Sequence, residues 1–60
     1  MSDTYISEAA ALRILMQEGE YAESQAQIVL NHSLRANIMG GNYYPMDYIY
    51  KRAKEHRERG

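Results

Sequence analysis

The chain contains no cysteine, and this removes two of the usual ways of stabilising a short protein. Its 60 residues form one domain at most, whose core supplies only about 3–5 kcal/mol of stability. Disulfides and thiolate-bound zinc are excluded, and His32 and His56 lie too far apart in sequence to suggest a metal site by themselves. We therefore expect no metal and no cofactor, and we expect a second copy of the chain or another protein to add stability.

Long apolar runs are also missing. No stretch approaches the roughly 18 apolar residues of a membrane-spanning helix, and the first residues do not have the basic and apolar segments of a secretory signal. These absences predict a cytoplasmic protein without a membrane partner. Phenylalanine and tryptophan are absent as well, so all six aromatic residues are tyrosine. A tyrosine ring carries a hydroxyl group that needs water or a partner, which suits interfaces better than a sealed core.

The usual catalytic signatures do not occur. There is no glycine-rich phosphate loop followed by Lys-Ser or Lys-Thr, no HExxH segment and no cysteine nucleophile. A substrate pocket of about 300 Å³ would also consume much of so small a core. We therefore expect a protein that is not an enzyme.

Charge is distributed unevenly. Residues 1–49 carry six acidic and two basic side chains, whereas residues 50–60 carry five basic and two acidic ones. The basic end has two interpretations. Cations are favoured near the C-terminus of a helix, and together with nearby tyrosines they also form the kind of patch that binds single-stranded nucleic acid. We favour the first interpretation.

Apolar periodicity predicts three helices, at about residues 7–18, 22–39 and 45–58. Ser7 is a suitable N-cap for the first helix, and Gly19 a suitable C-terminal residue. In the second, a stripe recurs every four residues, and Gly40 follows it. Pro45 suits the first turn of the third helix. The stripe of the second helix consists of Ala26, Leu30, Leu34 and Ile38.

These elements predict an all-α protein: a three-helix bundle, or a helical hairpin with a third helix, forming a single domain over residues 1–60. An alternative remains open for residues 34–50. A Gly-Gly pair between apolar runs is a hairpin signal, here Gly40-Gly41. If strands flank it, the order becomes helix–helix–hairpin–helix.

That alternative layout resembles the small winged helix-turn-helix of excisionase-like and MerR-like DNA-binding proteins. The resemblance rests on the opening Tyr5-Ile6-Ser7-Glu8-Ala9-Ala10, and on Leu34-Arg35-Ala36 followed by Gly40-Gly41-Asn42-Tyr43. It implies a DNA-binding regulator whose second helix reads bases. The matching segment here, residues 23–33, contains Gln and Asn but no Lys or Arg, although phosphate neutralisation supplies much of the affinity for DNA.

The sequence alone favours protein binding over DNA binding. Four tyrosines fall within residues 43–50, and tyrosine and arginine are enriched among interface hot spots. The predicted partner-binding residues are Tyr43, Tyr44, Tyr48, Lys51 and Arg52. Ile28 and Met39 fall outside the main helical stripe and are predicted contacts of a homodimer. The leading hypothesis is thus a small regulatory or inhibitory protein, of a size typical of phage, plasmid and bacterial regulators, that binds a protein partner and itself. A DNA-binding regulator is the alternative.

Overall fold

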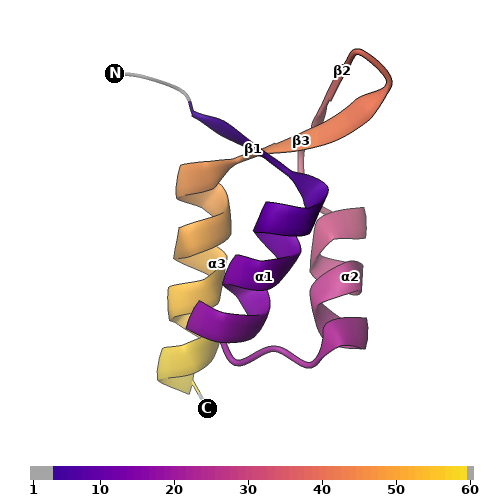
Figure 1. Cartoon of the computed structure of the whole chain (residues 1–60). Coiled ribbons are helices and arrows are strands. Elements are labelled where there is room, and N and C mark those ends of the chain that lie inside the picture. The colour runs from indigo at the N-terminus through magenta and orange to yellow at the C-terminus, as the bar shows by residue number, and fades with distance from the viewer. Residues whose placement is uncertain (1–3, 60) are drawn as a thin grey trace.

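The protein combines three helices with a small antiparallel sheet. Its computed structural model describes residues 4–59 and is shown in Figure 1. In chain order the elements are β1 (Tyr5–Ser7), α1 (Glu8–Glu18), α2 (Glu23–Asn31), β2 (Ala36–Ile38), β3 (Gly41–Pro45) and α3 (Met46–Arg59).

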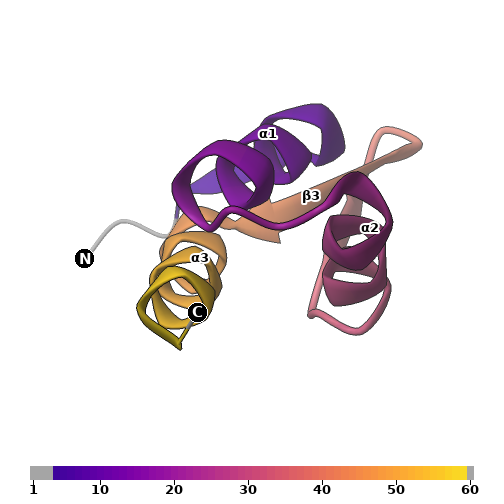
Figure 2. The same cartoon turned by 90° about the horizontal axis from the view of Figure 1, so that it is seen from below.

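The sheet lies across one end of the three helices (Figure 1). Its strand order is β1-β3-β2, so the last strand in the sequence is the central one. Figures 1 and 2 agree that α2 and α3 lie on either side of α1. The first helix packs extensively against both α2 and α3, while contact between α2 and α3 is slight at most. The helices therefore form a V, with α1 at its apex.

The prediction of an all-α protein is wrong, because residues 36–38 and 41–45 form strands. The first and third helices lie within one residue of their predicted bounds, but the helix expected over residues 22–39 ends at Asn31. In the predicted stripe only Ala26 and Leu30 are buried, whereas Leu34 is 83% exposed and Ile38 is 46% exposed. A spacing of four residues fits both a helix and a helix followed by an edge strand. Pairing with β3 decides between them here.

The alternative hairpin is the arrangement observed. Ile38 pairs with Gly41, which leaves Met39 and Gly40 as a two-residue turn. Both have positive φ, 51° and 82°, as a type I′ turn requires. The turn is thus Met39-Gly40 and not Gly40-Gly41, and the second glycine is already a strand residue.

The junction of α1 with α2 depends on a close approach between helices. Ser7 caps α1, its Oγ accepting a hydrogen bond from the Ala10 amide at 3.3 Å, as its sequence position predicted. Gly19 does end this helix, but with a φ of −101°, so it is not needed for a left-handed conformation. A Cβ atom there would lie 2.7 Å from the Ala53 Cα atom. Glycine is needed because α1 and α3 touch at this point.

The core lies where the three helices meet the central strand. Tyr44, in β3, is only 2% exposed and pairs with Ile6 of β1. Tyr50, in α3, is 46% exposed. The fully buried apolar residues are Ala11, Leu15, Ala26, Leu30, Tyr44, Ile49 and Ala53.

Candidate functional site

The second helix has a side that no other element covers. Its buried residues, Ala26 and Leu30, belong to the core formed with α1. Gln25 Oε1 accepts a hydrogen bond from the Ala22 amide at 3.4 Å and helps to start the helix. Away from the core, the spacing i, i+3, i+4, i+7 brings a second set of side chains onto one face. We call this set the outer face of α2; its members, exposed or half-buried, are Ser24, Gln27, Ile28 and Asn31.

The β2–β3 hairpin follows α2 after a short connection. Met39, at its turn, is 102% exposed. No charged residue occurs in residues 36–46, and the nearest cation is Arg35, an exposed residue of the connection. The hairpin therefore presents backbone and uncharged side chains to any partner.

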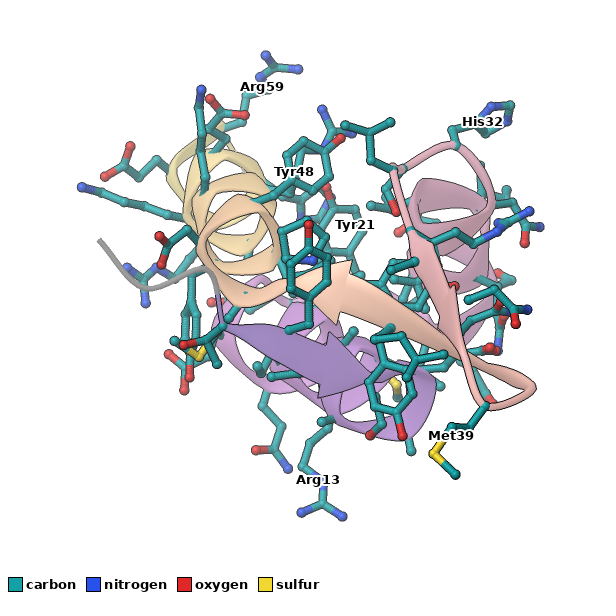
Figure 3. All side chains as sticks on the ribbon, turned by 90° about the horizontal axis from the view of Figure 1, so that it is seen from above. Arg13, Tyr21, His32, Met39, Tyr48 and Arg59 are labelled. Atoms are coloured by element: carbon teal, nitrogen blue, oxygen red, sulfur yellow. The ribbon has the colours of Figure 1, made fainter. Side chains whose placement is uncertain are left out.

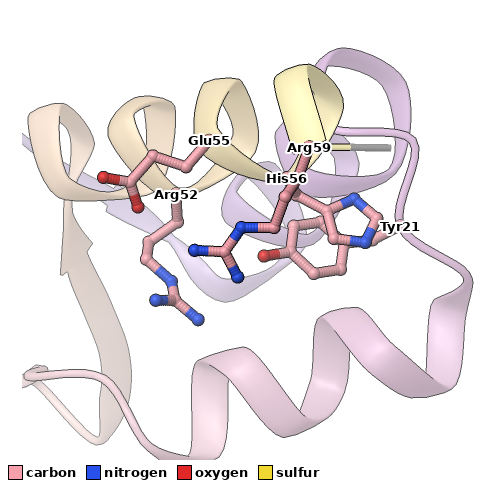
Figure 4. Close-up of a pocket in the computed structure, with 5 residues that line it drawn as sticks. All are labelled: Tyr21, Arg52, Glu55, His56 and Arg59. Atoms are coloured by element: carbon pink, nitrogen blue, oxygen red, sulfur yellow. The ribbon is translucent and has the colours of Figure 1, made fainter.

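A cleft of about 290 Å³ separates α2 from α3. Arg52, His56 and Arg59 form its α3 wall, at the spacing i, i+4, i+7 of one helical face. Gln25 and Ile28 contribute to the opposite wall. Figure 4 shows the Arg52 and Arg59 side chains extending from α3 into the space above α2.

The end of the cleft is held by aromatic stacking. The Tyr21 and His56 rings are stacked, with centroids 3.8 Å apart and planes inclined by 17°. His56 Nδ1 lies 2.6 Å from the Gly19 carbonyl oxygen, and because a carbonyl only accepts, Nδ1 carries the proton and donates. This ties the C-terminal part of α3 to the turn between α1 and α2.

One hydrogen-bond donor of Arg52 has no acceptor among residues 4–59. Its Nε atom is buried, and no hydrogen-bond acceptor is provided for it by residues 4–59. A buried donor without a partner costs about 1–3 kcal/mol. Glu55 borders a narrow part of the cleft, about 50 Å³ in volume, that Arg52 also lines, and it is the acidic residue there.

The predicted partner-binding residues do not form one surface. Tyr44 is in the core, so its side chain is not available to a partner in this fold, and Tyr43 is half-buried in β3. Tyr48 is 37% exposed and in Figure 3 is seen between α3 and α2. Arg52 lines the cleft, whereas Lys51 precedes it on α3 and does not line it.

The two predicted dimer contacts are also separated. Ile28 is 56% exposed on α2, and Met39 lies at the hairpin turn, so they do not share a helical face as the long predicted helix implied. Whether either residue contacts a second copy stays a prediction.

Sequence reasoning missed Tyr21, His56 and Arg59. The signal for the last two was present, because they follow Arg52 at helical spacing, but the basic end was interpreted as helix-end electrostatics. Tyr21 gave no such signal. It belongs to the turn after α1, and only the packing of α3 brings it to His56.

Residues 4–59 contain neither a cluster of metal ligands nor a membrane-spanning helix. No group of three or more His, Asp or Glu side chains is arranged to hold a metal ion. No helix in this part of the chain has the length and apolar character needed to cross a membrane.

The fold and site thus define an α+β protein that has one uncovered face on α2, an exposed uncharged hairpin and an arginine-lined cleft. No protein-family model matches this chain, and neither a curated protein nor a solved structure matches it.

Proposed function

We propose that this protein is a small, non-enzymatic regulator that binds duplex DNA in the cytoplasm. In this proposal the outer face of α2 enters the major groove, and the β2–β3 hairpin contacts the duplex beside it. The proposal replaces protein binding, which the sequence alone favoured, as the leading function.

One observation carries the proposal. The four residues 19–22, which include Gly19, join α1 to α2, and a hairpin follows α2. Two helices joined by a short glycine-containing turn are the pattern of a helix-turn-helix, whose second helix reads the major groove. The layout is also that of the winged proteins that residues 5–10 and 34–43 resemble.

The outer face of α2 has suitable chemistry for base recognition. Asparagine and glutamine each make paired hydrogen bonds with adenine, and apolar side chains contact the thymine methyl group. Asn31, Gln27 and Ile28 supply these groups on one face, and Ser24 adds a hydroxyl. This set favours sites rich in A·T pairs.

The cations near this surface are few. Arg35 precedes the hairpin, and Arg52 and Arg59 line the cleft beside α2, while α2 itself carries none. With two phosphates contacted, one by Arg35 and one at the cleft, the logarithm of the binding constant should fall against the logarithm of salt concentration with a slope of about −1.8. Binding should therefore be weak on random sequence and should depend on base contacts for affinity.

The test is selection of binding sites from a random duplex library, followed by fluorescence anisotropy at several salt concentrations. We expect an enriched A·T-rich motif. Asn31→Ala should relax that motif without changing the salt slope, and Arg35→Gln should reduce the slope by about 0.9. Arg13→Gln is the matched control, because it makes the same change of charge at an exposed position of α1. Absence of binding at low salt, or an equal effect of Arg13→Gln and Arg35→Gln, would overturn the proposal.

Association with a protein, in the first place another copy of the chain, is a second candidate function. It is favoured by the exposure of Leu34, Ile38 and Met39, which leaves three large apolar side chains of residues 34–39 in solvent. Sedimentation across a concentration range tests it. A dimer that Leu34→Gln with Met39→Gln converts to monomer would support this function, and a monomer at all concentrations would contradict self-association. For another protein partner, Tyr48→Ala is the informative variant, since Tyr44→Ala would disturb the core.

A further inference from the structure

We propose that the cleft between α2 and α3 is a phosphate-binding site, built from the guanidinium groups of Arg52 and Arg59 and the Tyr21 hydroxyl. In the complex with DNA it takes one phosphate of the backbone that flanks α2. That the phosphate belongs to DNA rests on the proposed function. The phosphate site itself is inferred from the geometry of the cleft and does not depend on DNA binding.

The charges of the cleft favour an anion. Two guanidinium groups extend from α3, and Glu55 is the acidic residue that borders the narrow part. Arginine presents a planar fork of N–H donors that matches the oxygens of phosphate. Side chains on the α2 wall are uncharged, so no carboxylate there opposes an anion.

The donors of Arg52 are partly uncommitted. Its Nε–H is buried, and residues 4–59 offer it no acceptor, whereas buried polar groups in proteins are normally paired. Since Nε is itself closed to solvent, a phosphate in the cleft would meet the terminal guanidinium nitrogens of Arg52, and Nε would gain an acceptor only when the side chain turns. Lysine does not provide an equivalent donor, because its charge sits at the end of a flexible chain.

The aromatic end of the site is in place before a ligand arrives. Tyr21 is stacked on His56, which is hydrogen-bonded to the Gly19 carbonyl oxygen. Figure 4 shows the Tyr21 hydroxyl directed toward the side where the guanidinium groups lie. Ordering of the aromatic pair costs nothing further on binding, and such preorganisation raises affinity.

The size of the site restricts the ligand. Its narrow part measures about 50 Å³ and is lined by Tyr21, Arg52, Glu55, His56 and Arg59. That volume is far below the roughly 300 Å³ of a small-molecule pocket. It admits a phosphate group and excludes a nucleobase. The wide part opens toward Gln25 and Ile28 of α2, so a strand running beside that helix passes the opening.

Inorganic phosphate is the first probe, in an NMR titration of the full chain at constant ionic strength maintained with chloride. We expect saturable shifts of the Arg52 Nε–H resonance and of the amides of residues 19–22. Arg52→Gln and Arg59→Gln should each weaken phosphate binding at least tenfold. Lys54→Gln is the matched control, because two helical positions beyond Arg52 lie on the opposite side of α3, and it should change affinity less than twofold. Glu55→Gln should strengthen binding.

The second probe is the duplex selected above. Arg52→Gln should reduce the salt slope of duplex binding by up to about 0.9, the value for loss of the one phosphate that Arg52 and Arg59 share, and Lys54→Gln should leave it unchanged. Circular dichroism of each variant shows that the fold is retained.

The outcomes separate the two proposals. Phosphate binding that survives in the variant carrying both Arg52→Gln and Arg59→Gln overturns the phosphate site, even if the duplex binds. Phosphate binding without duplex binding supports the site, overturns DNA as its source and indicates a small phosphorylated ligand. Duplex binding in which Arg52→Gln and Lys54→Gln have equal effects supports the function and overturns the inference.

Discussion

The part of the molecule formed by α1, α3, β1 and β3 differs from the part formed by α2 and the hairpin. In the first, backbones approach so closely that a Cβ atom on Gly19 would meet Ala53, and Tyr44 is almost fully buried. In the second, α2 leaves a whole face uncovered, and large apolar side chains lie in solvent. We infer that stability resides mainly in the first part and binding in the second.

The largest effect should come from removing the central aromatic side chain. Tyr44→Ala deletes a buried ring, and such truncations cost about 3–5 kcal/mol, close to the whole stability expected of a 60-residue chain. We expect loss of the native circular dichroism spectrum. Tyr50→Ala, at a side chain that is 46% exposed, is the control and should cost about 0.5 kcal/mol. A folded Tyr44→Ala protein would place the core elsewhere.

The contact between α1 and α3 is the next point to break. Gly19→Ala places a methyl group 2.7 Å from the Ala53 Cα atom and 2.9 Å from the Leu15 carbonyl oxygen, and overpacking of this kind costs about 1–3 kcal/mol. Urea denaturation should show a lower midpoint with an unchanged slope. An unaltered midpoint would mean that the helices do not approach as described.

A glycine-to-alanine substitution in the hairpin should act through backbone conformation and not through a steric clash. Gly40→Ala meets no atom within 4 Å, but φ there is +82°, and a left-handed conformation costs an L-residue about 1–2 kcal/mol. Hydrogen exchange should accelerate in β2 and β3 and stay slow in α1. Equal acceleration throughout would show that the two parts are not energetically distinct.

The smallest effect is expected at an exposed apolar residue of the connection between α2 and β2. Leu34→Gln changes a side chain that is 83% exposed, so the free energy of unfolding should change by no more than about 0.5 kcal/mol. For a domain of this size, that corresponds to about 2–4 °C in thermal midpoint. A larger loss that grows with protein concentration would instead reveal an interface between copies.

The sequence predicted α1 and α3 because their signals are local. Ser7 supplies a cap, and Pro45 precedes the first turn of α3. The helix over residues 22–39 was overextended because Leu34 and Ile38 continue the four-residue spacing of Ala26 and Leu30, although Leu34 lies in the connection and Ile38 in β2. The hairpin signal at Gly40-Gly41 was real but displaced by one residue, since the pairing of Ile38 with Gly41 sets the turn.

The candidate site was only partly predictable for the same reason. Arg52 was identified, but its partners were sought among the neighbouring tyrosines. In the structure it shares a cleft with Tyr21 and with residues of α2. Those contacts span about 30 positions of the sequence, and no pattern within a single helix specifies them.

The sequence by itself determined a small chain without disulfides or thiolate-bound zinc, two of its helices, and an uneven distribution of charge. These features follow from composition and from interactions within a few residues. The tertiary structure was needed to show that residues 36–38 and 41–45 pair as strands, that Tyr44 is core and that Arg52 and Arg59 face α2. Each of these depends on packing between distant segments, where burial and backbone hydrogen bonding outweigh local preference.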